Sequence, residues 1–567
     1  MSLNLGDDRP PISSARGSGV WALADEYWEY FRSSAQLWNV DRGDVDQIER
    51  WEDLSEGGVA ARCERLTEFA ARAAMIPAIT SADATMAAAV GFSAASTAVT
   101  LPWTRDLALV GAPANLAFVL STLVPGYALT SDREADGYLA KLRGIPAFLD
   151  GFVDGLRSGM RSGRVATARG VSHLTGWLDD VLASDLADDP LARIAAPASM
   201  TLASVERWRT ELVATLTSVV RPALGGLRAV LRDEALPHAR SDDHVGLCYL
   251  PGGAEAYEEL LWVATSIRRS SAQIHQLGLD ELDRLDAEYT TIGGPLFGHD
   301  DPATIRQRLR DDSTLRYGST ADIVADVGAL LGRATTEAPS WFTRLPEADC
   351  VALPTHGGPM ACYTAPSPDG HRPGRFLFDA AQPARWTRYS LPPTVFHETI
   401  PGHHLQIGLA SELDLHPVLA ELEVTAFEEG WGLYAERLAD EMGLYASPLQ
   451  RLGMLTMDSL RASRLVVDTG LHALAWTRQQ AIDFLVEHTA LDTVAAAIEI
   501  DRYIADPGQA TSYMVGRIEI DRLRAEAAAH VGRRFSHRAF HDVVLNGGMT
   551  PLEQLARRVR QWTATEP

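Results

Sequence analysis

The sequence predicts a large, mainly helical protein with one small antiparallel sheet. Two observations lead to this fold class. Apolar residues recur at helical spacing through most of the 567 residues, as they do on the buried face of an amphipathic helix. Short β-prone runs between glycine- and proline-rich turns are confined to residues 345–391. A chain of this length predicts two to four domains or one large layered domain, and we expect a helical lobe over 1–240 and a second lobe over 241–567.

The first lobe is expected to be a stack of helices. Residues 64–75 carry apolar side chains about 3.6 residues apart. The same pattern continues over 133–160, where Pro146 predicts an interruption because proline lacks the N–H that a helix interior needs. Residues 200–233 form another long stretch with an apolar stripe.

The composition excludes several classes of protein. The net charge of −24 repels phosphate backbones and anionic lipids, so we expect neither a nucleic-acid nor a membrane partner. The apolar stretches 86–103 and 107–129 are rich in small residues or interrupted by proline, which favours buried helices over membrane spans. Residues 1–19 lack a basic region followed by an apolar run, and no Cys-x-x-Cys pair occurs. These features indicate a cytoplasmic protein.

The sheet is predicted from three short runs of strand-forming residues. These runs are residues 351–353, 361–364 and 375–379. Turn-rich segments at 357–359 and 367–370 separate them, which favours antiparallel neighbours joined by tight turns. The sheet therefore ends just before the segment that carries the chemistry.

That segment, residues 396–406, places His397, Glu398, His403 and His404 within eight positions. Imidazoles bind metal ions as neutral ligands, and an adjacent carboxylate can serve as a general base. In a regular zinc-binding helix the two histidines are four residues apart, so both rings reach one ion. On an unbroken helix His403 lies ~240° round from His397 and ~9 Å further along, and the two rings cannot share an ion.

The proline-glycine step between the histidines changes that geometry. Pro401 has no N–H for the carbonyl of His397, so the helix must bulge or break there. Gly402 allows backbone angles that other residues resist. If two residues loop out, His403 returns to the position of a regular second ligand; His404 is the alternative.

A third ligand is expected from the helix predicted over 421–442. Its acidic residues include Glu428, Glu429 and Glu436, and Glu429 follows His403 by enough chain to turn and run back alongside. Two imidazoles, one carboxylate and an open position are typical of a catalytic zinc site.

The ordered motifs resemble the bacterial domain-of-unknown-function 885 family, which is grouped with the gluzincin-type zinc metallopeptidases. The motifs are residues 397–404, 429–436, 464–476 and 502–516. The resemblance implies a two-lobed metallopeptidase-like fold with a deep channel. It also implies His397, His403 and Glu429 as metal ligands and Glu398 as the base.

The later motifs supply candidates for binding the substrate and its reacting carbonyl. By analogy with the C-terminal tyrosines of related peptidases, we expect Tyr513 to donate a hydrogen bond to the oxyanion. Arg464, together with Arg461, suits a bidentate contact with a substrate carboxylate. The remaining expected substrate-binding residues are His472, which pairs with Asp468 in this interpretation, and Arg502, Tyr503 and Gln509.

The sequence thus predicts a zinc-dependent hydrolase of short peptides or small amides, with one Zn²⁺ per chain. One alternative keeps the metal, with iron or manganese in place of zinc, and acts on another amide or a natural-product intermediate. The other alternative is an inactive helical binding protein.

Overall fold

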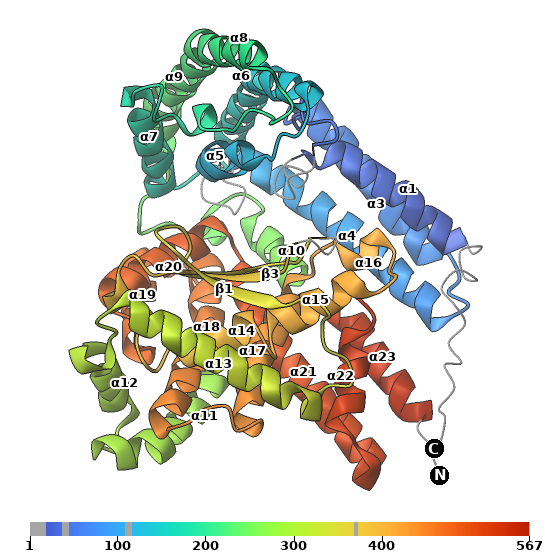
Figure 1. The fold of residues 1–567 in the computed structure, drawn as a ribbon, viewed down its shortest axis with the longest axis vertical. Helices are drawn as coiled ribbons and strands as arrows, with labels where there is room; N and C mark the ends of the chain where they lie inside the picture. The colour runs from blue at the N-terminus through green and yellow to red at the C-terminus, as the bar shows by residue number, and fades with distance from the viewer. Residues whose placement is uncertain (1–18, 37–44, 108–115, 368–371, 566–567) are drawn as a thin grey trace.

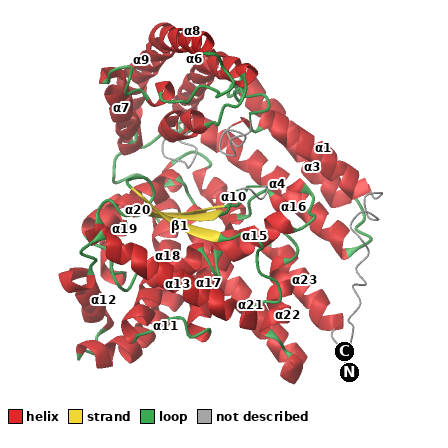
Figure 2. Cartoon of the chain, in the orientation of Figure 1, coloured by secondary structure: helices red, strands yellow, loops and turns green. Residues whose placement is uncertain are grey.

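The computed structural model describes residues 19–36, 45–107, 116–367 and 372–565. Helices form nearly all of the regular structure, and three strands form a sheet near the middle of the molecule (Figures 1 and 2). The prediction of a mainly helical chain with a small sheet is therefore confirmed. Residues 1–18, on which the expectation about a leader rests, lie outside the described residues.

The first lobe is built around α6 (Asp132–Ser162), which ends at Gly163 with a left-handed φ of 76°. The predicted interruption at Pro146 does not occur, and α6 runs through it. Ile145 and Phe148 on either side are buried in the core of this lobe, and their packing holds the helix where a backbone hydrogen bond is missing. The other helices of this lobe are α5 (Leu116–Phe118), α7 (Ala168–Ala183), α8 (Leu202–Thr215) and α9 (Arg221–Val230), with π-helical turns after α8 and α9.

Three long helices, α1 (Gly19–Ser34), α3 (Glu56–Met75) and α4 (Ser81–Asp106), pack together along one side of both lobes (Figure 1). Among the described helices, α4 alone has the length and apolar composition that a membrane crossing needs. α4 is less buried than the expected core helix, since 28% of its apolar window is buried. Its buried face packs with α16 (Pro417–Ala420) through Leu419. The other apolar stretch, 107–129, falls partly at 108–115, outside the described residues.

The second lobe contains the remaining helices and the sheet. Its principal core joins buried residues from Leu247 to Val559, whereas the core of the first lobe lies between Ile48 and Ala235. The helices are α10 (Gly253–Thr265), α11 (Ser271–Phe297), α12 (Pro302–Asp311), α13 (Thr320–Trp341), α14 (Leu391–Glu398), α15 (His403–Glu412), α17 (Thr425–Glu441), α18 (Pro448–His472), α19 (Arg478–His488), α20 (Thr493–Ala505), α21 (Ser512–Val531), α22 (His537–Leu545) and α23 (Leu552–Thr565).

The sheet is mixed, so the antiparallel prediction was right for only one of its two strand pairs. The central strand β3 (Gly374–Asp379) pairs antiparallel with β2 (Ala361–Thr364) and parallel with β1 (Cys350–Thr355). The chain between β1 and β2 therefore crosses over instead of forming a hairpin. Pairing depends on long-range packing, which the local turn residues do not reveal.

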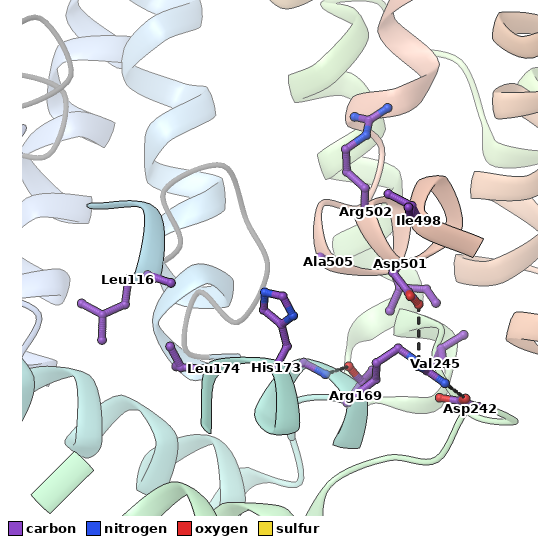
Figure 3. Close-up of a pocket in the computed structure, with 14 residues that line it drawn as sticks. Leu116, Arg169, His173, Leu174, Asp242, Val245, Ile498, Asp501, Arg502 and Ala505 are labelled. Atoms are coloured by element: carbon purple, nitrogen blue, oxygen red, sulfur yellow. Dashed lines mark hydrogen bonds and ion pairs between the residues drawn. The ribbon is translucent and has the colours of Figure 1, made fainter. Parts of the chain in front are cut away.

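A cavity of about 380 Å³ lies between the lobes (Figure 3). One side of its wall is formed by α5 and by α7, and Arg169 and His173 lie on α7. The other side is formed by α20, which carries Ile498. Arg169 forms ion pairs with Asp242 and Asp501 at the rim. The two lobes are thus joined by charged contacts around a largely apolar space.

Candidate metal centre

The helix is interrupted between the two predicted histidine ligands. α14 ends at Glu398 and α15 begins at His403, so the break spans Thr399 to Gly402 and includes a cis Ile400–Pro401 bond. Gly402 is required here because a Cβ would stand 1.8 Å from the carbonyl oxygen of His397. The return of His403 toward His397 therefore comes from a break between two helices, not from a bulge within one.

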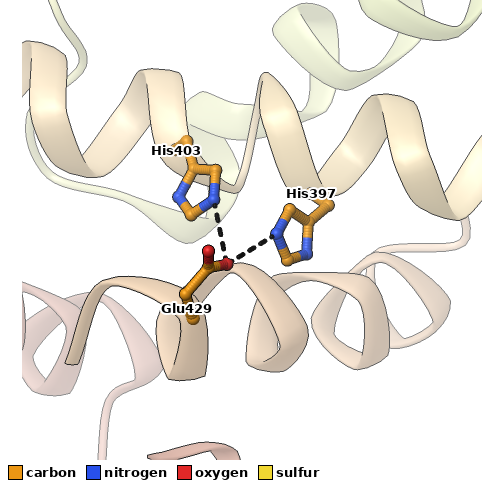
Figure 4. A group of neighbouring side chains, drawn as sticks. All are labelled: His397, His403 and Glu429. Atoms are coloured by element: carbon orange, nitrogen blue, oxygen red, sulfur yellow. Dashed lines mark hydrogen bonds and ion pairs between the residues drawn. The ribbon is translucent and has the colours of Figure 1, made fainter. Parts of the chain in front are cut away.

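The break brings both imidazoles onto one carboxylate oxygen (Figure 4). The Nε2 atom of His397 lies 3.3 Å and that of His403 lies 3.5 Å from Oε2 of Glu429 on α17. The two rings stand nearly perpendicular, with centroids 4.6 Å apart. A tetrahedral metal ion takes four ligands, and His397, His403 and Glu429 offer three of them.

The spacing fits a tetrahedral zinc ion. Nitrogen and oxygen ligands lie ~2.1 Å from zinc, so two of them at a tetrahedral angle stand about 3.4 Å apart. The distances of 3.3 and 3.5 Å between the histidines and Glu429 match that separation. The histidine side chains are buried, while Glu429 keeps 22% of its side chain exposed. Protein atoms therefore enclose the two histidines, and the site is open to solvent on the side of Glu429.

A second carboxylate fixes the orientation of His397. Glu436, two turns after Glu429 on α17, accepts a hydrogen bond at 2.9 Å from Nδ1 of His397. With the proton held at Nδ1, the lone pair of Nε2 points toward Glu429 and His403. Gly432 lies against the same ring, and a Cβ at this position would stand 2.6 Å from Cε1 of His397.

The four groups together favour a positive charge between them. Burial disfavours a charged imidazole, but hydrogen bonds to Glu429 and Glu436 outweigh it and raise the pKa of His397 to about 10. Burial opposes the negative charge of Glu429, yet the hydrogen bonds from both histidines hold its pKa well below the usual range. A proton or a divalent cation satisfies the same arrangement.

Glu398 is the carboxylate next to this cluster that makes no hydrogen bond to another described residue. Burial raises its pKa, and the nearby charges of His403 and His397 lower it in turn. The side chain is partly exposed. It is thus free to exchange protons with a water molecule or a ligand beside the histidines.

Tyr513 on α21 lies beside Glu429. Burial, with the charge of Glu429 as the next cause, raises the pKa of Tyr513 to about 12. The two helices approach backbone to backbone, since a Cβ at Gly430 would stand 2.5 Å from Cα of Gly516. The ring lies under the guanidinium group of Arg464, 4.6 Å from its centroid. Tyr513 therefore lies between Glu429 of the candidate metal centre and the guanidinium group of Arg464.

Four of the expected substrate-binding residues form one network around Glu499, a residue that sequence reasoning missed. They are Arg464, Arg502, Tyr503 and Gln509. Glu499 on α20 accepts hydrogen bonds from Arg464 at 2.9 Å, from Arg502 at 3.2 Å and from the hydroxyl of Tyr503. Tyr503 also accepts a bond at 2.7 Å from Nε of Arg464, and Gln509 accepts one at 2.7 Å from Arg502. The signal was present, because Glu499 precedes Arg502 and Tyr503 by one helical turn.

Two predicted residues point elsewhere. His404 packs against the sheet, where its Nδ1 lies 2.9 Å from the hydroxyl of Tyr363. The prediction for His472 was wrong, because its Nδ1 accepts from the N–H of Leu247 and its Nε2 donates to the carbonyl of Tyr503. His472 thus has no ring nitrogen left for a substrate. Asp468 binds other partners, namely the Tyr257 hydroxyl and the Gly508 N–H, so the expected pair with His472 is not formed.

The fold and this cluster define a mainly helical protein with a His-His-Glu candidate metal centre at the junction of α14, α15 and α17. Residues 37–559 match the family described as bacterial protein of unknown function (DUF885), and the chain belongs to that family.

Solved structures share the whole fold. The crystal structure of a "putative lipoprotein" from Colwellia psychrerythraea has a TM-score of 0.85 at 24% identity, over 96% of this chain and 99% of that one. A "putative lipoprotein of unknown function" from Shewanella oneidensis has a TM-score of 0.77 at 19% identity, over 95% and 99%. No curated protein matches the chain.

Proposed function

We propose that this protein is a metal-dependent hydrolase of peptide or related amide bonds, with Zn²⁺ held by His397, His403 and Glu429. The observation that carries the proposal is the convergence of two Nε2 atoms on one carboxylate oxygen at the spacing of tetrahedral ligands. A zinc ion in such a site lowers the pKa of water and polarises a carbonyl group. The gluzincin-like metallopeptidases are the class of enzyme that this donor set fits.

Glu398 is the proposed general base. Its carboxylate is unpaired among the described residues and partly exposed, and burial raises its pKa, which makes the carboxylate a stronger base. It receives a proton from the attacking water and passes it to the leaving nitrogen of the amide. A glutamate engaged in an ion pair would be held too firmly for both transfers.

Tyr513 is the proposed oxyanion donor. With its pKa raised to about 12, the phenol keeps its proton at neutral pH and can donate it in a hydrogen bond. Its position beside Glu429 places this donor at the edge of the metal cluster, where negative charge develops on the carbonyl oxygen.

The test is elemental analysis of the purified protein followed by digestion of a peptide library. We expect one zinc ion per chain, and we expect Glu398→Gln to retain the metal while hydrolysis falls roughly 10²- to 10⁴-fold. Glu487→Gln changes an exposed carboxylate on α19 and serves as the matched control. Full activity of Glu398→Gln contradicts the mechanism, and a protein that binds no divalent metal contradicts the proposed class.

The cellular location is a separate proposal. The composition of the N-terminal segment led us to expect the cytoplasm, while both structural neighbours carry the description lipoprotein. Fractionation of cells that make the protein distinguishes a soluble from a membrane-attached pool.

A further inference from the structure

Two guanidinium groups beside the metal cluster have N–H groups without acceptors. Arg464 is 6% exposed, and its second terminal nitrogen is buried with no hydrogen-bond partner among the described residues. Arg461, one turn earlier on α18, is similar: its Nε is buried and unpartnered, while its Nη1 donates to the sulfur of Met457 at 2.8 Å. Buried donors are nearly always satisfied, so these two groups call for an acceptor.

Arginine and glutamate side chains gather at this point. Three arginines, Arg461, Arg464 and Arg502, act on Tyr513, and Glu499 is the carboxylate that Arg464 and Arg502 share. Glu436 stands 3.9 Å from Arg461, but its oxygen is already engaged with His397. This concentration of positive charge lies within a protein whose net charge is −24. A small anion is the ligand that the unpartnered N–H groups of Arg461 and Arg464 would accept as a hydrogen-bond acceptor.

The positive group lies very close to the metal cluster. Arg461 is separated from the ligand His397 by a single carboxylate, that of Glu436. Tyr513 contacts both Arg461 and Arg464 through its ring and lies beside Glu429. Arg461 and Glu429 keep 12% and 22% of their side chains exposed, so a ligand can reach both. An anion held here would therefore lie beside a carbonyl group bound at the candidate metal centre.

We infer that Arg461 and Arg464 bind the free α-carboxylate of the substrate, so that the enzyme releases single residues from the carboxyl end of a peptide or N-acyl amino acid. A carboxylate matches the planar fork of guanidinium groups. In a C-terminal residue the carboxylate is only two bonds from the scissile nitrogen. This inference rests on the proposed function for the hydrolytic step, but the binding step stands alone.

Binding of a panel of N-acetyl amino acids and their C-terminal amides, measured by calorimetry on metal-free and zinc-loaded protein, tests the subsite. The panel contains N-acetyl-glycine, -leucine, -phenylalanine and -glutamate. We expect at least one acid to bind roughly 10- to 100-fold more tightly than its amide, the effect of losing a charged hydrogen-bond partner. Arg461→Gln should remove that preference, because the amide lacks the charge and the fork of the guanidinium group. Circular dichroism checks that the variant is folded.

Arg451→Gln is the control, since Arg451 lies on the same helix but forms an exposed ion pair with Asp440. Arg464→Lys is the second variant, which keeps the charge and loses the fork; it should weaken the preference without abolishing it. Equal binding of acids and amides, no binding of any panel member, or a preference that survives Arg461→Gln overturns the inference.

Hydrolysis separates this inference from the proposed function. Peptides with a free carboxyl end should lose their last residue, and C-terminally amidated peptides should be cleaved at least ~10-fold more slowly. Cleavage of both kinds of peptide at equal rates would support the hydrolase activity and contradict removal of single residues from the carboxyl end. Selective binding of acids without any hydrolysis would support the carboxylate subsite and contradict the proposed enzymatic function.

Discussion

Gly432 lies directly against the imidazole of His397, where a side chain at position 432 would put its Cβ 2.6 Å from Cε1 and 2.7 Å from Nε2. The helix α17 therefore supplies Glu429, a candidate metal ligand, and, one turn later, the gap that admits the ring of His397.

Gly432→Ala is expected to displace the ring of His397 from Glu429. We expect zinc affinity to fall roughly 10- to 100-fold, the range for altered support of a metal ligand, while the helical content is retained. Competition with a chromogenic chelator measures the affinity, and circular dichroism measures the helix content. Gly328→Ala on α13 is the matched control, because a Cβ there meets nothing within 4 Å; unchanged affinity in Gly432→Ala would count against His397 as a ligand.

The neighbouring histidines 403 and 404 should separate into a ligand and a structural residue. His403→Ala removes an Nε2 that faces Glu429, so stoichiometric zinc binding should be lost. His404→Ala removes the contact with Tyr363 on β2 and should lower the free energy of unfolding by ~1–3 kcal/mol while the metal is retained. Elemental analysis and urea unfolding of both variants check this; the opposite assignment of effects would identify His404 as the ligand.

Glu436→Gln is expected to weaken metal binding without touching a ligand. The amide still accepts from Nδ1 of His397, but it lacks the charge that increases the basicity of the opposite nitrogen. We expect zinc affinity to fall roughly 10- to 100-fold. Glu441→Gln, at the exposed end of the same helix, should leave affinity unchanged. Equal affinities in the two variants would show that Glu436 has no part in holding the histidine.

Asp468 predicts a pH dependence of stability. Burial raises its pKa to about 7, although hydrogen bonds from Tyr257 and Gly508 oppose the rise. In the unfolded chain the pKa is ~3.9, so the folded protein holds a proton that the unfolded chain releases. The stabilisation from this group is fully present below pH ~4 and is lost as pH rises through 7.

Asp468→Asn removes that titration. Relative to the wild type, the variant should gain about 1–4 kcal/mol in the free energy of unfolding between pH 4 and pH 8. Urea denaturation across this range measures the difference, with Asp483→Asn on the exposed side of α19 as the control. A difference that stays constant with pH would show that Asp468 is charged in the folded protein throughout.

Local chemistry made much of the centre predictable. Proline and glycine between His397 and His403 marked the departure from a regular helix, and the break now explains how both rings face Glu429. Glycine is unfavourable in a helix interior, yet the structure needs Gly432 inside α17. Helix propensity is a local quantity, and it carries no information about a ring from another helix that must fit there.

Features that depend on contacts between distant segments could not be predicted from the sequence. Glu436 was known as a competitor of Glu429, but its bond to Nδ1 of His397 depends on how α14 crosses α17. The parallel pairing of β1 with β3 depends on where the chain returns after β2. His472 was expected at the site because it lies in the family motif 464–476, yet two main-chain groups occupy both of its ring nitrogens.

The contact of α17 with α21 at Gly430 and Gly516 has one more consequence. Glu429 precedes the first glycine and Tyr513 lies one turn before the second, so main-chain atoms, not pliable side chains, set how far apart the two groups stand. Enlarging either glycine would force the two helices apart and would increase the distance between Glu429 and Tyr513. The spacing of these two groups is therefore fixed by the backbone, whereas that of the arginines on α18 and α20 depends on the conformation of long side chains.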